Sequence, residues 1–483
     1  MSQDKIGTDQ WVEQYQGRVN RRNRVALLVD RASKRLPVWA WLIILALVAA
    51  TLPLLTSNDL VIRIAGNVAL LGALALGLNV VVGYAGLLDL GFVAFYGIGA
   101  YAYAYLSSNF IGIHLPTGIT LIAITVISGL FGLLLGLPSL RLLGDYLAIV
   151  TLGFGLIFQQ LMTSMTRVSI PGQPSPVNLT GGPNGILNLD PIRIFGWTAS
   201  SVTDYYYIML VLLVVMMLVI YHLYKSRLGR AWSALREDEL AAEAMGMPTR
   251  RLKVQAFATG AAIAGLCGGL FAAWQGSVFP SNFDTNLLIN LYAIIVLGGL
   301  GSLPGVLIGS LVIVAVPDVL RNADLAGKLF YLGAIVTLFG ALKPRWQTPL
   351  LLIAVAVFGL IVKFIILAIP SLGWAPLPPV GSAYLDVIHS WLVAPANPVL
   401  TGNAGNIGFA ALLILGLGVT RIKNTWARFV VLIPTLYLLV FVWETRLSQE
   451  ASVTRLLFIG VLLIVLMIYR PNGLLGQKRV EIV

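Results

Sequence analysis

The sequence predicts an all-α, polytopic transmembrane helical bundle with about 14 spans. Of the 483 residues 58% are hydrophobic and only 11% are charged, and apolar runs recur along the chain. A soluble domain has roughly 45–50% apolar and about 25% charged residues. A helix crosses the hydrocarbon core with about 20 apolar residues, whereas a barrel strand needs only about 9–11. The composition therefore excludes an ordinary soluble enzyme, and the length of the runs favours helices.

The apolar runs divide into ten spans that surround the charged loops and four that lie together in the C-terminal half. We place the ten at 38–56, 60–82, 87–107, 117–137, 146–165, 205–224, 254–275, 286–300, 302–318 and 454–469. The other four are at 328–342, 348–369, 404–420 and 429–443. The short run 286–300 has the alternative of a re-entrant segment.

Positive charge orients these spans. With the N-terminus in the cytoplasm, 24 of the 32 lysine and arginine residues fall in cytoplasmic segments, as the positive-inside rule requires. Both termini are therefore expected to be cytoplasmic. This bias and contact with anionic headgroups explain the net charge of +12 without a nucleic-acid partner. The N-terminal segment 1–37 contains a basic, partly apolar stretch, Asp9–Arg35, for which an interfacial helix and a mobile tail are both open.

No catalytic or metal-binding constellation is apparent. The three histidines are scattered, and the single cysteine, Cys267, lies in an Ala/Gly-rich run that favours helix packing. No GxxxxGK[ST] phosphate loop is present. We therefore expect that this chain is not an enzyme, with no cofactor bound by it and no metal site.

Glycine is the most informative residue type in this sequence, which contains 49 glycines. It clusters at three predicted helix breaks, at Gly83–Gly86, at Gly153 and Gly155, and at Gly298–Gly301. Broken helices at membrane depth are tolerated where they line a path, although close helix packing is the alternative. Polar residues in apolar runs are functional candidates by default. The candidate translocation-path residues are Asn79, Gly83, Tyr84, Gly86, Asp89, Gly91, Gly298, Gly299 and Gly301.

The loop 225–253 is predicted to be a docking element. It combines basic ends with a run of helix formers, a Gly246 that suits a helix C-terminus, and Pro248 soon after. The positive-inside rule does not explain its acidic residues, so mixed charge on a compact helix favours an interface over a solvated loop. The candidate residues for docking to a cytoplasmic partner are Arg236, Glu237, Asp238, Glu239, Glu243 and Gly246.

Six stretches together resemble the LivM-type permeases of ATP-binding-cassette importers for branched-chain amino acids. They are LGLNVVVGYAGLLDLGFVAFYGIGAY (76–101), LRLLGDYLAIVTLGFG (140–155), LTGGPNGI (179–186), LGRAWSALREDELAAEAMG (228–246), VLGGLGSLPG (296–305) and YRPNGLLG (469–476). The resemblance implies a second, LivH-type permease, two cytoplasmic ATPases that use the ATP, and an extracytoplasmic solute-binding protein. It further implies that Glu237–Gly246 is the coupling helix and that the chain is a multi-pass protein of the bacterial inner membrane.

The sequence departs from this family at two places. Leu156 and Gln159 stand where the family commonly has an acidic residue and an arginine. A transmembrane segment, 321–453, is inserted between the permease core 38–320 and the last helix and tail 454–483. Its start repeats the spacing of the last helix, which suggests a duplication. A peripheral belt against lipid and contact with the binding protein both remain open for its outer loop, 370–403.

The resemblance makes a branched-chain amino acid permease the leading hypothesis. A permease for urea or short amides is the alternative within the same class, because no residue here fixes a side-chain pocket. A self-contained secondary transporter centred on Asp89 is the alternative from a different class. That alternative predicts an inverted repeat, and we find none in the sequence.

Overall fold

The computed structural model describes most of the chain from residue 47 onward. The described residues are 47–139, 145–166, 168, 178–194, 196–319, 323–341, 347–379, 383–421, 425–447, 460, 464 and 473–475. The predicted N-terminal segment 1–37, the start of the first span and nearly all of the last helix 454–469 lie outside them. The chain divides into two compact units, Met1–Ile295 with Leu300–Leu307, and Val296–Gly299 with Ile308–Val483.

The elements of the first unit are mainly helices, with strands of only two residues. The helices are α4 (Leu52–Leu55), α5 (Asp59–Leu78), η1 (Asn79–Tyr84), α6 (Phe92–Leu106), α7 (Thr117–Ser139), α8 (Asp145–Ser164), η2 (Gly182–Asn184), α9 (Val202–Lys225), α10 (Arg227–Glu237), α11 (Glu239–Ala244), α12 (Thr249–Gln275), η3 (Pro280–Phe283), α13 (Thr285–Gly298) and α14 (Leu303–Ser310). The strands are β1 (Ser107–Ser108), β2 (Ile113–His114), β3 (Ile186–Leu187), β4 (Arg193–Ile194), β5 (Trp197–Thr198) and β6 (Ser277–Val278), which pair antiparallel as β1–β2, β3–β6 and β4–β5.

The second unit follows from η4 onward. Its elements are η4 (Leu311–Ala315), α15 (Val316–Val319), α16 (Ala323–Ala341), α17 (Gln347–Leu367), η5 (Pro370–Leu372), β7 (Trp374–Pro376), α18 (Ala383–Trp391), β8 (Val393–Pro395), α19 (Pro398–Arg421), α20 (Thr425–Val442) and η6 (Trp443–Leu447). Strands β7 and β8 pair antiparallel. The ends of α13 and α14 fall on the boundary between the two units.

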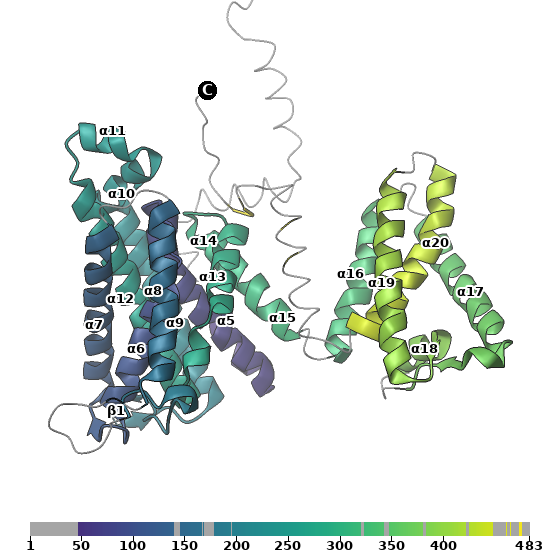
Figure 1. Ribbon diagram of the computed structural model, residues 1–483, viewed down its shortest axis with the longest axis horizontal. Helices are drawn as coiled ribbons and strands as arrows, with labels where there is room; N and C mark the ends of the chain where they lie inside the picture. The colour runs from purple at the N-terminus through teal and green to yellow at the C-terminus, as the bar shows by residue number, and fades with distance from the viewer. Residues whose placement is uncertain are drawn as a thin grey trace, which may run out of the picture. The chain divides into compact units, whose positions relative to one another are not determined.

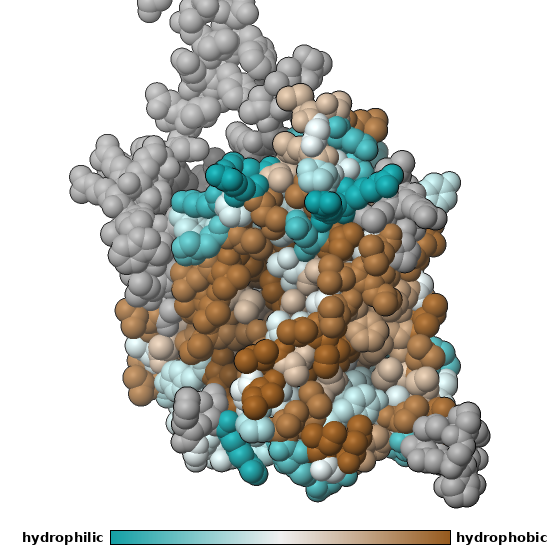
Figure 2. Space-filling view, turned by 90° about the vertical axis from the view of Figure 1, so that its left-hand side faces the viewer, coloured by the Kyte–Doolittle hydropathy of each residue, from teal (hydrophilic) through white to brown (hydrophobic). Residues whose placement is uncertain are grey.

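Eight helices among the described residues are long and apolar enough to cross a membrane. They are Asp59–Tyr84, Thr117–Leu137, Tyr146–Ser164, Val202–Lys225, Thr249–Gln275, Gln347–Leu367, Leu400–Val419 and Trp426–Thr445. On the face shown in Figure 2, hydrophobic residues form a broad band with hydrophilic residues above and below it. The structure thus confirms a polytopic helical membrane protein.

Helix α12 is the centre of the first unit and packs against α6 and α7, while α5 packs against α9. Glycines allow the closest approach. A Cβ on Gly99 of α6 would lie 2.1 Å from the carbonyl oxygen of Gly265 on α12, so only glycine fits there. Small residues bring membrane helices together in this way, because van der Waals packing replaces the hydrophobic effect in lipid. In Figure 1, α10 and α11 lie at one end of this unit and β1 at the other.

The second unit has its own apolar core. Leu351 and Val355 of α17, Leu392, and Tyr437 and Phe441 of α20 are buried together. Each van der Waals contact in this core is weak, but together they stabilise the packing of the unit.

Three differences separate the predicted spans from these helices. Helix α8 runs through Gly153 and Gly155, so the prediction of a helix break there is wrong. Gly155 instead lies where a Cβ would be 3.4 Å from the Cα of Gly91, and the glycine serves close packing. Helix α6 begins at Phe92, later than the predicted 87, because the break after Gly83 extends to Gly91. Helix α13 has 14 residues, which at 1.5 Å each is about 21 Å, too short to cross the membrane alone.

Candidate coupling and translocation site

The first glycine break is a wide helical turn followed by non-helical chain. Asn79–Tyr84 forms a π-helix, η1, and residues 85–91 leave the helix before α6 begins. π-Helical turns are rare and frequently occur at functional sites. Asn79 is fully buried here and Asp89 is 1% exposed. The break therefore places two polar side chains inside the first unit, as the sequence predicts.

Four other segments hold this break by hydrogen bonds. The Gly301 N–H, in the turn before α14, donates to Asn79 Oδ1 at 2.9 Å. Tyr292 of α13 donates its hydroxyl hydrogen to the Asp89 carbonyl at 2.7 Å. The Leu90 N–H donates to Thr151 Oγ1 of α8 at 2.9 Å. The fourth contact comes from α10, where the Arg236 guanidinium donates to the carbonyl oxygen of Gly83.

Glycine is required where these segments meet. A Cβ on Gly83 would lie 2.0 Å from Asn79 Oδ1 and 2.8 Å from the Gly301 nitrogen. Gly86 has φ +73°, and a Cβ there would lie 2.8 Å from Cγ of Arg236. Gly301 has φ +80°, a left-handed conformation that costs other residues energy. The first and third predicted breaks are thus in direct contact through Gly83 and Gly301, with Arg236 beside both.

Two polar atoms at the break have no partner among the described residues, Asn79 Nδ2 and Asp89 Oδ2. A buried donor or acceptor left unpaired costs about 1–3 kcal/mol. Asn79 Nδ2 is a donor and Asp89 Oδ2 an acceptor, so the break could both donate a hydrogen bond to another molecule and accept one from it. Tyr84, at the same turn, stacks on Tyr224 of α9 with ring centroids 4.7 Å apart.

The docking loop folds as two helices and not as the single helix that the sequence predicts. Asp238 separates α10 from α11 and caps α11 by accepting from the Ala241 N–H at 3.0 Å. The loop is anchored by Trp232 of α10, which is fully buried and donates to the Leu252 carbonyl at 2.9 Å. Gly246 follows α11 with φ +78°, so its predicted role at a helix C-terminus is confirmed.

Helix α11 is held to α12 by one ion pair and also presents exposed side chains. Lys253 of α12 is 3% exposed, and its Nζ lies 2.5 Å from Glu239 Oε1. Leu240, the next residue of α11, is 78% exposed, and Met245, directly after the helix, is 82% exposed. Glu243 is also exposed, as is Glu237 at the end of α10. These exposed apolar side chains, next to exposed acidic ones, are accessible to a partner protein.

Gly298 and Gly299 contact residues near the C-terminus. The N–H groups of Leu474 and Leu475 donate to the carbonyls of Leu297 and Gly298, at 2.9 and 3.0 Å. A Cβ on Gly473 would lie 2.5 Å from the Cα of Gly299. These two glycines therefore pack against the motif YRPNGLLG near the C-terminus, of which residues 473–475 are described.

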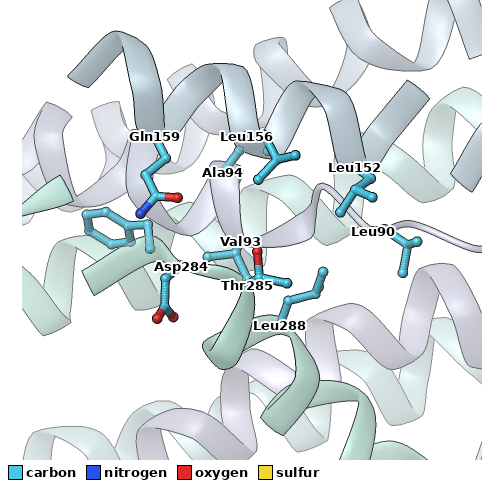
Figure 3. A pocket seen from close by; sticks show the side chains of 11 residues that line it. Leu90, Val93, Ala94, Leu152, Leu156, Gln159, Asp284, Thr285 and Leu288 are labelled. Atoms are coloured by element: carbon cyan, nitrogen blue, oxygen red, sulfur yellow. The ribbon is translucent and has the colours of Figure 1, made fainter. Parts of the chain in front are cut away.

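A small pocket lies between α6, α8 and the start of α13 (Figure 3). Its volume is about 20 Å³, room for roughly one water molecule and far below the size of a ligand site. Leu156 and Gln159, the two positions that depart from the family pattern, line it with Asp284. Asp284 caps α13, because its Oδ1 accepts from the Leu287 N–H at 3.0 Å.

Sequence reasoning missed four residues that complete this site, namely Thr151, Trp232, Lys253 and Tyr292. The positive-inside rule is sufficient to explain a lysine at position 253, although the four acidic residues earlier in the same loop are possible ion-pair partners. Trp232 lies in the docking-loop motif, where an aromatic residue in a polar helix indicates an anchor. Nothing in the sequence indicates the contacts of Thr151 and Tyr292, because both form across helices.

Comparisons with known proteins agree with this geometry. The family described as "Branched-chain amino acid transport system / permease component" matches residues 60–342. The chain is 37% identical to the high-affinity branched-chain amino acid transport system permease protein LivM of Escherichia coli K12 over 333 residues, which cover 64% of this chain and 75% of that protein. It is 36% identical over 102 residues to the permease protein LivH of Salmonella typhimurium, covering 21% of this chain and 32% of LivH. No solved structure matches.

Fold and similarity define the class as a multi-pass permease of the inner membrane, a transport component and not an enzyme. The chain belongs to the family of permease components of branched-chain amino acid transport systems.

Proposed function

We propose that this chain is the LivM-type subunit of an ATP-driven importer and provides the translocation path for branched-chain amino acids. The family and the similarity to LivM over three quarters of that protein support this solute. The partners in this proposal are a second, LivH-type permease, two cytoplasmic ATPases and an extracytoplasmic solute-binding protein. ATP is hydrolysed by the ATPases, and both termini of this chain, with about 14 spans between them, face the cytoplasm.

The contact of Arg236 with Gly83 is the observation that carries the mechanism. Helices α10 and α11 are the docking element for an ATPase, and Leu240, Glu243 and Met245 form the surface that meets it. When the docked ATPase moves, α10 and α11 move with it. They carry α12 along, because Trp232 and the Glu239–Lys253 ion pair fix the two helices to α12. Arg236 then transmits the motion to the break at Gly83, and through Asn79 to Gly301.

The path itself is proposed at this break. Asn79, Gly83, Tyr84, Gly86, Asp89, Gly91 and Gly301 line it. Gly298 and Gly299, which the sequence also assigns to the path, pack against residues 473–475. A zwitterionic amino acid offers both a donor and an acceptor, and the unpaired atoms Asn79 Nδ2 and Asp89 Oδ2 are of the matching kinds. Movement of the break would expose them to the solute, and the ATP-driven step would shift the population between closed and open states.

Uptake in proteoliposomes tests this function. The chain is reconstituted with its second permease, ATPases and binding protein, and uptake of radiolabelled leucine is measured with and without internal ATP. We expect uptake that requires ATP, that valine and isoleucine inhibit and that urea does not. Inhibition by urea would favour the urea or short-amide alternative. Ion-driven uptake without ATPases would establish a secondary transporter and overturn the proposal.

A further inference from the structure

Three polar side chains from three elements meet in the interior of the second unit. They are Tyr331 of α16, His389 of α18 and Glu444 of η6. Glu444 is 4% and His389 8% exposed. Charged residues in apolar helical segments are costly, and their presence indicates a function by default. The proposed transport mechanism uses none of the three, and they lie in the inserted part of the chain.

The geometry joins them through the two carboxyl oxygens of Glu444. The Tyr331 hydroxyl donates to Oε1 at 2.5 Å, and His389 Nε2 lies 3.1 Å from Oε2. Glu444 sits on a π-helical turn, η6, whose wider path lets the side chain reach α16 and α18 at the end of α20. The rings of Phe330 and Trp443, one residue before Tyr331 and Glu444, stack 4.0 Å apart at 5° and fix the two elements together.

The other ring nitrogen of His389 determines the number of protons in the pair. Nδ1 lies 2.6 Å from the carbonyl oxygen of Pro378, which can only accept, so Nδ1 carries a hydrogen. The contact between Nε2 and Oε2 needs one further hydrogen. It is held either as imidazolium with carboxylate or as neutral imidazole with carboxylic acid, and both arrangements contain one proton between the two side chains. Removing that proton would place the Nε2 lone pair opposite a carboxylate oxygen.

Other charged side chains lie on the elements packed around this pair. Lys328 of α16 is one turn from Tyr331, and Asp386 of α18 is one turn from His389. Lys363 of α17 donates to the Ser390 carbonyl at 2.8 Å, next to His389. We propose that His389 and Glu444 form a proton-binding site that ties α18 to η6, with Tyr331 holding the carboxyl group in place.

Glu444→Gln gives the sharpest test, because a glutamine amide imitates the protonated carboxyl at every pH. Its oxygen accepts from Tyr331 and its NH₂ donates to a neutral Nε2. Protonation of His389 would instead bring two donors face to face, the glutamine NH₂ and the Nε2–H. The full chain is purified in detergent, and its thermal unfolding midpoint is followed by tryptophan fluorescence between pH 5 and pH 9. We expect the wild-type midpoint to fall as the pH rises, and the variant midpoint to fall as the pH drops.

Two controls separate this site from general effects. Tyr331→Phe removes one donor and is expected to lower the midpoint while keeping the wild-type direction of the pH dependence. Asp190→Asn alters the exposed His114–Asp190 pair of the first unit, whose atoms lie 2.5 Å apart, and is expected to leave the direction unchanged. Parallel pH profiles of the wild type and Glu444→Gln would overturn the proposal.

A measurement on the unmutated chain covers the case in which Glu444→Gln does not fold. The chain has three histidines, so ¹⁵N-histidine labelling gives few signals in solid-state NMR. We expect one histidine, identified by its loss in His389→Gln, to keep Nδ1 protonated throughout the titration while Nε2 gains and loses its hydrogen. A neutral His389 with a bare Nδ1 would contradict the proton count on which the site rests.

Discussion

The guanidinium of Arg236 donates a hydrogen bond to the carbonyl oxygen of Gly83, 153 residues earlier in the chain. Arg236 belongs to the loop 225–253, which is predicted to dock a partner. Gly83 belongs to the helix break that is predicted to line the translocation path. A single side chain thus connects the surface on which an ATPase would act to the segment that would open. The account predicts that residues on this connection affect coupling, whereas nearby residues off it do not.

Charge reversal at Glu243 is expected to weaken ATPase docking. Glu243 is exposed on α11, beside Leu240 and Met245, and has no role in holding α11 to α12. The variant Glu243→Lys should fold normally and hydrolyse ATP with little solute uptake. Co-purification of the ATPases and the ratio of uptake to hydrolysis measure this. Unchanged, fully coupled uptake would show that Glu243 lies outside the docking surface.

Gly83→Ala is expected to damage the protein, whereas Gly153→Ala is not. The new methyl group at residue 83 would lie 2.0 Å from Asn79 Oδ1, and overpacking of this kind costs roughly 1–3 kcal/mol. At Gly153 no described atom lies within 4 Å of the added Cβ. Unfolding midpoints and leucine uptake of the two variants provide the comparison. Equal behaviour of both variants would mean that the break tolerates side chains.

Neutralising Glu239 is expected to destabilise the docking loop. The change Glu239→Gln keeps a hydrogen-bond acceptor but leaves the buried Lys253 ammonium without its counter-charge, and a buried charge is costly unless it is paired. Hydrogen exchange of residues 238–253 should increase. Asp238→Asn is the control, because asparagine also caps a helix. Protection equal to that of the wild type would show that Trp232 alone anchors the loop.

Removal of residues 328–454 is expected to preserve ATPase docking. The deletion takes out four predicted spans, an even number, and leaves the whole loop 225–253 in place. Affinity purification in mild detergent measures whether the shortened chain still associates with the second permease and the ATPases. Loss of assembly would show that the inserted segment belongs to the structural core of the permease.

Much of this fold is predictable from the sequence because lipid leaves few choices for apolar runs. The ranges of α7, α8, α17 and α20 follow directly from hydropathy. The breaks at Gly83 and Gly298–Gly301 follow from glycine clusters, but the same argument fails at Gly153. A single glycine lowers helix stability by only about 1 kcal/mol, so α8 continues through both Gly153 and Gly155, and Gly155 lies close to Gly91.

The candidate site is less predictable than the fold. Residue types located the break and the docking loop separately, because each has a local signature in glycine or in mixed charge. Their contact through Arg236 depends on the packing of α10 beside η1, which no local pattern encodes. The same holds for Tyr292, whose hydroxyl reaches Asp89 from a segment 203 residues away.

The measurement that tests the central claim most directly compares leucine uptake and ATP hydrolysis in the same proteoliposomes for the wild type, Arg236→Ala and Arg230→Ala. Arg230 is the matched control, since it lies on the same helix and donates at 2.9 Å to Lys225, within its own loop. A hydrogen bond from a charged group contributes roughly 1.5–3 kcal/mol, which is a factor of about 10 to 100. We therefore predict that Arg236→Ala hydrolyses ATP with uptake per ATP reduced at least about tenfold, while Arg230→Ala resembles the wild type. Wild-type uptake per ATP in Arg236→Ala would contradict the account.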